Sequence, residues 1–88
     1  MTNAEKRHLD RISNMGCILC GSPAEIHHLR TVCGMSQRAN NFLTIPLCSE
    51  HHRHGTFGNA IHNGYQEFSK NHGSEGDLLA KTIERMTK

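Results

Sequence analysis

Two short pairs of cysteine and histidine residues constrain the fold of this chain more than any other feature. Cys17 and Cys20 are separated by two residues. Far downstream, Cys48 and His51 repeat that spacing. Two intervening residues let a tight turn direct both ligands at one ion, and a set of thiolate and imidazole ligands favours tetrahedral zinc. The sequence therefore predicts a structural Zn²⁺ ion held by these four side chains, which would tie two distant segments together.

A metal staple suits a chain of this size. Its 88 residues bury only a small core, and 35% of them are hydrophobic, with no Trp and one Tyr. The four cysteines could instead form two disulfides, which would require an oxidising compartment. The N-terminus is polar and lacks the apolar run of a signal peptide, and no stretch resembles a membrane span. We therefore expect a cytoplasmic protein with no membrane partner. Cys33, outside the two spaced pairs, is expected to be a buried or bystander thiol and not a ligand.

The first half of the chain predicts a helix followed by two short strands and a further helix. A helix is expected over residues 2–14, and short strands over 24–29 and 43–47. Ser49 is expected to cap a short helix that follows the second strand. These elements indicate a small α+β fold.

The C-terminal third contains two apolar stripes at helical spacing. The first stripe comprises Ile61, Tyr65 and Phe68. The second, on the expected buried side of a last helix, comprises Leu79, Ile83 and Met86. Ser74 and Asp77 predict a capping box at the start of that last helix.

A second group of polar residues surrounds the two expected strands. Adjacent histidines, His27 and His28, end the first strand, Asn41 precedes the second, and His52 follows the zinc ligand His51. Neighbours on a strand point to opposite sides, so both histidines can serve one site only where the strand ends or twists. One could then contact a metal ion while the other acts as a base, because imidazole titrates near neutral pH. The alternative is a pair of half-exposed strand histidines.

The order His–His, Asn, Cys-x2-His-His resembles the HNH (ββα-metal) nuclease family, and most closely the phage recombination-enhancement nucleases called Ref. The matching segments are 24–30, 37–41, 43–48 and 50–53, together with 17–20 and 77–80. The resemblance implies a ββα-metal core with a structural zinc knuckle and flanking helices. It implies one nuclease domain over 1–88, with an N-terminal helix over 1–14, the knuckle and core over 15–54, and C-terminal helices over 55–88.

The resemblance also implies roles for the second group. His28 would be the general base, and Asn41 would orient it by hydrogen bonding. A catalytic divalent ion (Mg²⁺, Mn²⁺ or Zn²⁺) would be held by three histidines: His27, His52 and His62. For the third of these positions, His54 is the competitor of His62.

The implied reaction is hydrolysis of DNA phosphodiester bonds. The net charge of +2 is too small to argue for nucleic acid by itself. However, Arg30 and Arg38 flank the hairpin loop and Arg53 adjoins the metal histidines, so we expect these three to contact phosphates. Phosphate contacts predict weak sequence specificity and strong dependence on salt. The alternative is a non-catalytic zinc-binding module for DNA or protein.

The resemblance extends to biological setting. It implies a phage or bacterial origin, action in the bacterial cytosol (the host's, if the chain is phage-encoded), and a RecA-type recombinase filament as a partner. The family has an extra basic N-terminal region where this chain has only a short helix, so a shared dependence on the filament stays open.

Overall fold

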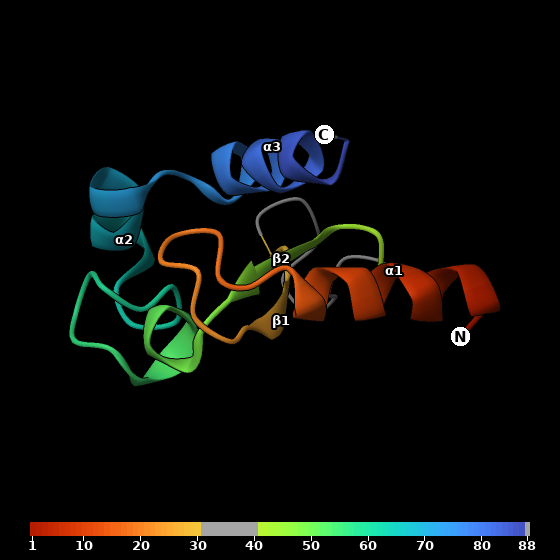
Figure 1. The fold of residues 1–88 in the computed structure, drawn as a ribbon. Helices are drawn as coiled ribbons and strands as arrows, with labels where there is room; N and C mark the ends of the chain where they lie inside the picture. Colours follow the sequence, from red (N-terminus) through yellow and green to blue (C-terminus); the bar gives the residue numbers. More distant parts are fainter. Residues whose placement is uncertain (31–40, 88) are drawn as a thin grey trace.

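Helices surround a two-stranded sheet in the computed structural model, which describes residues 1–30 and 41–87 (Figure 1). The elements in chain order are α1 (Asn3–Asn14), β1 (Glu25–His28), β2 (Thr44–Leu47), η1 (Glu50–His54), α2 (Tyr65–His72) and α3 (Glu75–Met86). The small α+β fold expected from the sequence is confirmed. The expectations for Cys33 and Arg38 lie outside the described residues.

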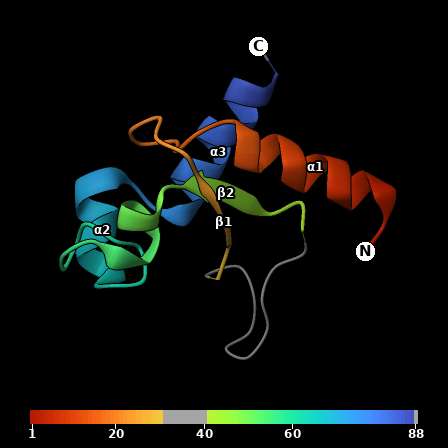
Figure 2. The same cartoon turned by 60° about the horizontal axis from the view of Figure 1, so that its bottom comes forward.

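The sheet is an antiparallel hairpin whose second strand is buried. Glu25 pairs with Leu47 and His28 pairs with Thr44. Every residue of β2 is buried because α1 and α3 both pack against it, as the two views in Figures 1 and 2 show. Pro46 is tolerated within β2 because each strand of a two-stranded sheet is an edge strand. The core lies between this strand and the helices, and its most buried side chains are Ile12, Leu29, Ile45, Leu47, Phe68 and Leu78.

The helix starts show which capping signals in the sequence were correct. The capping box of Ser74 and Asp77 is present at the start of α3, as predicted. A second capping box, between Thr2 and Glu5, begins α1. Ser49 does stand at the N-cap position of η1, as predicted, but its side chain makes no capping hydrogen bond. The segment after Ser49 is instead a wide π-type turn, closed by a 2.8 Å hydrogen bond from the backbone N–H of Gly55 to the carbonyl of Glu50.

The C-terminal helices differ from their predicted stripes. Helix α2 begins at Tyr65, so Ile61 is buried in the preceding turn and does not lie on the helix. In α3 the buried residues are Glu75, Leu78 and Thr82, whereas Ile83 is 51% exposed. Of the predicted stripe, Leu79 does pack partly buried against the core, but the most buried side of the helix lies about one residue, or roughly 100° of rotation, away. Glu75 points inward on this side and is hydrogen-bonded to His27 of β1, an arrangement that an apolar stripe does not reveal.

None of the helices in the described ranges is long and apolar enough to cross a bilayer.

Candidate metal centres

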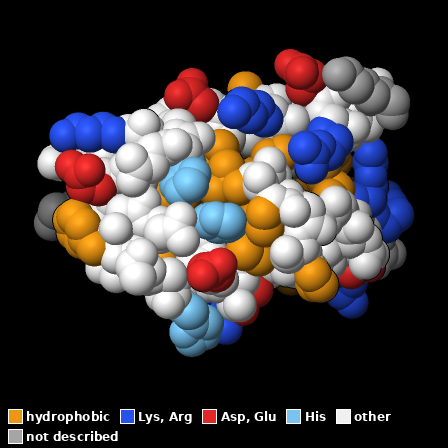
Figure 3. Space-filling model, turned by 60° about the vertical axis from the view of Figure 1, so that its left-hand side comes forward, with side chains coloured by type: hydrophobic (Ala, Val, Ile, Leu, Met, Phe, Trp, Pro, Cys, Tyr) orange, Lys and Arg blue, Asp and Glu red, His pale blue; other side chains and the backbone are white. Residues whose placement is uncertain are grey.

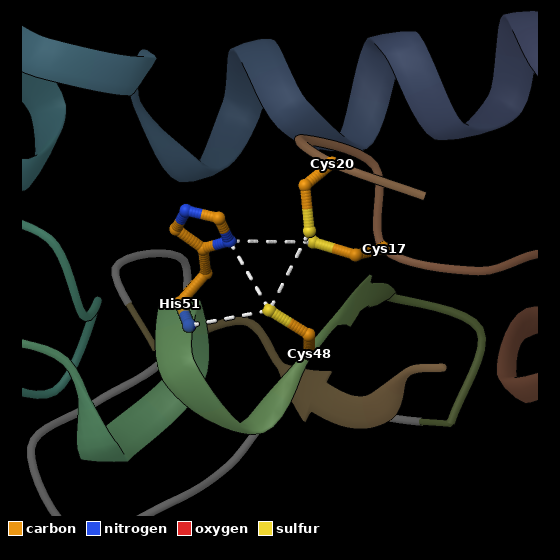
Figure 4. A group of neighbouring side chains, drawn as sticks. All are labelled: Cys17, Cys20, Cys48 and His51. Carbon is orange, nitrogen blue, oxygen red and sulfur yellow. Dashed lines mark hydrogen bonds between the residues drawn. The ribbon is translucent and has the colours of Figure 1, made fainter. Parts of the chain in front are cut away.

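The four side chains of the two spaced pairs converge on one point, shown in Figure 4. The Sγ atoms of Cys20 and Cys48 lie 3.7 Å apart. Nδ1 of His51 lies 3.2 Å from Sγ of Cys48 and 3.7 Å from Sγ of Cys17. Ligands at zinc distances in a tetrahedron are about 3.3–3.8 Å apart, so these separations are close to the edges of such a tetrahedron. The knuckle cluster, as we call Cys17, Cys20, Cys48 and His51, could hold a structural metal ion such as zinc.

The first half of the knuckle cluster is built by a tight turn. The backbone N–H of Cys17 donates to the carbonyl of Ser22 (2.7 Å), and that of Gly21 donates to the carbonyl of Cys17 (2.8 Å). Gly16 and Gly21 both have positive φ angles (80° and 79°), a conformation that glycine adopts without strain. The backbone N–H of Leu19 lies 3.4 Å from Sγ of Cys17, as a donor toward the ligand sulfur.

The second half of the knuckle cluster follows β2. The backbone N–H of Ile18 donates to the carbonyl of Pro46 (2.9 Å), which holds the tight turn beside β2. Cys48 comes directly after β2, and the turn of η1 brings His51 back so that its backbone N–H donates to Sγ of Cys48 (3.5 Å). The spacing of two residues therefore produces the geometry that the sequence predicted for both pairs.

The exposed thiol of Cys20 and the buried thiol of Cys48 differ in acidity. Hydrogen bonds from the side chain and backbone of Ser22 lower the pKa of Cys20 to about 6, so this thiol is mostly thiolate at neutral pH. Burial raises the pKa of Cys48, so its proton would leave when a cation binds.

Three histidines from separate segments form a second group, which we call the histidine cluster: His27, His52 and His62. Their ring centroids are 4.7–5.2 Å apart. Nε2 of His52 lies 3.1 Å from Nε2 of His62, close to the separation of about 3.0–3.4 Å for two imidazole ligands of one ion. The structure thus brings His62 to this group, whereas His54, an exposed residue of the described range, belongs to neither cluster.

Two of the three rings in the histidine cluster are hydrogen-bonded to carboxylates. Nε2 of His27 lies 2.5 Å from Oε2 of Glu75, and both side chains are 2% exposed. Nδ1 of His52 lies 2.7 Å from Oε1 of Glu25. A carboxylate that accepts one ring N–H leaves the lone pair of the other ring nitrogen available, which is the common arrangement behind metal-binding histidines. The sequence did not reveal a role for either glutamate. The available signal was the position of Glu75, which directly follows the predicted helix cap Ser74.

The electrostatics favour neutral imidazoles at two members of the histidine cluster, His52 and His62. Burial lowers the pKa of His52 and of His62. Arg53, followed by His52, lowers the pKa of Glu25 to about 2. Neutral rings beside ionised carboxylates are the state in which histidine binds a cation.

Two of the three predicted DNA-contacting arginines, Arg30 and Arg53, lie beside the histidine cluster. Arg53 donates to both oxygens of Glu25 (3.1 and 2.6 Å), so it supports the carboxylate that holds His52. Nη1 of Arg30 lies 3.4 Å from Nδ1 of His62. Arg30 also lines a cavity of about 300 Å³ together with His27, Ile61, His62, Tyr65 and Glu75. Figure 3 shows histidine side chains reaching the surface on the face that carries η1 and α2.

His28 and Asn41 form a separate hydrogen-bonded pair. Nε2 of His28 lies 2.9 Å from Oδ1 of Asn41. His28 is opposite Thr44, whose hydroxyl lies 3.4 Å from Nε2 of His8 on α1. The neighbouring His27 faces α3 instead, as alternation along a strand requires. The two adjacent histidines therefore face different helices.

Comparison with known proteins identifies a family without assigning a reaction. No curated protein and no solved structure matches the chain significantly. The family described as protein of unknown function (DUF968) matches residues 1–88. This match spans the knuckle cluster, the histidine cluster and the His28–Asn41 pair. The chain belongs to the DUF968 family.

Proposed function

We propose that this chain is a metal-dependent DNA endonuclease of the HNH (ββα-metal) type, with the β1–β2 hairpin and η1 as its core. One observation carries the proposal: three imidazoles converge beside a cavity that Arg30 also lines. Metal sites with a catalytic role typically have three protein ligands and one open position, whereas structural sites have four. The histidine cluster fits the first description and the knuckle cluster, with zinc, fits the second.

The histidine cluster supplies the ligands that such a reaction needs. A divalent ion held by His27, His52 and His62 would act as a Lewis acid on the phosphate and stabilise the leaving oxygen. Three imidazoles suit a first-row transition ion such as Zn²⁺ best, whereas Mg²⁺ and Mn²⁺, which favour oxygen ligands, are candidates from the resemblance. His62 would then ligate through Nε2 and carry its proton on Nδ1. That nitrogen could no longer accept from Arg30, so the guanidinium would be free to contact a phosphate oxygen.

His28 is the proposed general base. Its hydrogen bond to Asn41 restricts the ring, and removal of such a base typically costs a factor of about 10²–10⁴ in rate. The proposed contacts to the phosphates of the DNA backbone are made by Arg30, Arg38 and Arg53. Contacts of this kind predict a weak preference for DNA sequence. The RecA-type filament stays a prediction from resemblance.

Nicking of supercoiled plasmid by the zinc-loaded protein tests the proposal. With Mg²⁺ or Mn²⁺, we expect wild type to convert plasmid to nicked or linear form. His62→Ala should abolish cleavage, and His28→Ala should reduce it by about 10²-fold or more while the zinc content stays constant. His54→Ala is the matched control, because His54 is exposed on the same turn as His52, and it should cleave like wild type. If wild type cleaves plasmid with neither Mg²⁺ nor Mn²⁺, the endonuclease proposal is refuted.

A non-catalytic zinc-binding DNA module is the second candidate. It is favoured by one observation: His27 and His28 face different helices, which separates the proposed base from the histidine cluster across β1. The module predicts that wild type retards DNA in a gel without cutting it, and that His28→Ala binds equally well. The same variants therefore separate the two functions.

A further inference from the structure

We propose that Glu5, in the first turn of α1, is a positioning residue that fixes the tautomer and orientation of His28 through Asn41. The effect of Glu5 on catalysis rests on the proposed endonuclease function. The hydrogen bonds between Glu5, Asn41 and His28 do not depend on that function, so the positioning role and the endonuclease activity can be tested separately.

An unbroken series of hydrogen bonds connects the start of α1 to the ring of His28. Oε1 of Glu5 accepts from the backbone N–H of Thr2 (2.8 Å), and Oε2 accepts from Nδ2 of Asn41 (2.9 Å). Oδ1 of Asn41 then lies 2.9 Å from Nε2 of His28. Thr44 holds the backbone of Asn41, because its hydroxyl donates to the Asn41 carbonyl (3.2 Å). Both oxygens of Glu5 are therefore engaged, each by a different segment.

The chemistry of these groups permits one arrangement of hydrogens. An ionised carboxylate only accepts hydrogen bonds, so the NH₂ end of the Asn41 amide must face Glu5. The amide oxygen must then face His28, and an oxygen only accepts. In the neutral ring, the hydrogen therefore resides on Nε2, and Nδ1 keeps the lone pair that a base requires. The hydrogen bond from the backbone of Thr2, followed by that from Asn41, lowers the pKa of Glu5 and keeps it ionised.

Substitution of Glu5 by Gln should break this order. Gln offers one acceptor oxygen where the backbone of Thr2 and the amide of Asn41 require two. With its partner lost, the Asn41 amide can turn over and present its NH₂ to Nε2 of His28. That orientation favours the tautomer with hydrogen on Nδ1, which removes the lone pair from the proposed basic nitrogen.

Thr2→Ala is the matched control. The hydroxyl of Thr2 accepts from the backbone N–H of Glu5 (3.1 Å), so its loss weakens the cap of α1. The backbone N–H of Thr2 remains, and both bonds of the Glu5 carboxylate are retained. A purely structural role for Glu5 as a helix cap would make Thr2→Ala and Glu5→Gln behave alike.

Long-range ¹H–¹⁵N NMR of the histidine rings, on zinc-loaded protein at a pH where His28 is neutral, provides the test. We expect the Nε2–H form of His28 in wild type and Thr2→Ala, and a shift toward the Nδ1–H form in Glu5→Gln. Glu5→Ala provides a second variant with the same expectation if Glu5→Gln folds poorly. A wild-type ring in the Nδ1–H form, or an unchanged tautomer in both Glu5 variants, would overturn the proposal.

Plasmid cleavage gives the second readout. We expect Glu5→Gln to lower kcat at least tenfold with little change in KM and no change in zinc content, whereas Thr2→Ala should retain wild-type kcat. If wild type does not cleave, the endonuclease proposal fails, and the NMR result still decides whether Glu5 positions His28.

Discussion

The carboxylate of Glu75 lies 2.5 Å from the ring of His27, although 48 residues of sequence separate them. The other oxygen of Glu75 accepts from the backbone N–H of Arg30 (2.9 Å), and the Glu75 backbone N–H donates to the hydroxyl of Tyr65 (3.1 Å). A buried carboxylate is tolerated only when its oxygens are bonded in this way. Glu75 thus joins α3 to β1 and α2 behind the histidine cluster.

Glu75→Gln should therefore weaken both the fold and the histidine cluster. The amide keeps the shape of the side chain but donates from one end, so its bond to His27 survives only if that ring carries its hydrogen on Nδ1, which removes the lone pair offered to a cation. We expect a destabilisation of about 1–3 kcal/mol by urea unfolding. We expect a 10- to 100-fold loss of Mn²⁺ affinity by calorimetry on zinc-loaded protein. Glu84→Gln, an exposed position on the same helix, should change stability by less than about 0.5 kcal/mol. Equal Mn²⁺ affinity in the two variants would contradict the supporting role of Glu75.

The knuckle cluster should be needed for folding. Because the core is small, the free energy of metal binding is expected to be a large part of the stability of this chain. Cys48→Ser should lose the bound zinc and the dispersed amide spectrum of a folded protein, and a strong chelator should do the same to wild type. The control is Cys33→Ser, since the sequence predicts a bystander thiol at that position. Full zinc content in Cys48→Ser would show that this cysteine is not a ligand.

Gly16 should be intolerant of a side chain. A Cβ atom there would lie 2.8 Å from the carbonyl oxygen of Gly21, and the φ angle of 80° disfavours other residues. Gly16→Ala is expected to lower the free energy of unfolding by about 1–3 kcal/mol. Gly76→Ala is the matched control, because its added Cβ would have only the Ser74 hydroxyl nearby, at 3.8 Å, inside a helix that favours alanine. That control should be stabilised by about 0.5–1 kcal/mol, and the two thermal unfolding curves should move in opposite directions.

Local spacing explains what could be predicted from the sequence. The knuckle cluster was predictable because two residues between ligands determine a turn, and a turn is short-range geometry. The strands and the capping box of Ser74 were predictable for the same reason. Each depends on neighbours within a few positions.

Tertiary packing explains what could not be predicted. Glu5, Glu25 and Glu75 look like ordinary surface residues in the sequence, and their partners come from distant elements. The most buried side of α3 differs from the predicted stripe because periodicity counts apolar residues only, and two of its buried residues are polar. Thr82 is buried there with its hydroxyl bonded to the carbonyl of Leu78 (2.8 Å), which removes the cost of burying a polar group.

Proton competition should make the affinity of the histidine cluster depend on pH. Burial lowers the pKa of His52 and His62 below the ordinary value of 6.5, so both rings are neutral at pH 7. In the unfolded chain the same two histidines take up protons at about pH 6.5, before the folded rings do. Between that pH and the lowered pKa, each decrease in pH therefore lowers the free energy of unfolding. Below that point, protons and a cation compete for the same lone pairs. Titration of zinc-loaded protein with Mn²⁺ should therefore give similar affinity at pH 8 and 7, and protonation of these two rings should weaken binding only after the pH has fallen below their ordinary value of 6.5. Zinc content measured at each pH separates this loss from release of the structural ion. If the affinity for Mn²⁺ already falls between pH 8 and 7 while the zinc is retained, one of the ligands is protonated at neutral pH. The rings would then not be held as the structure indicates.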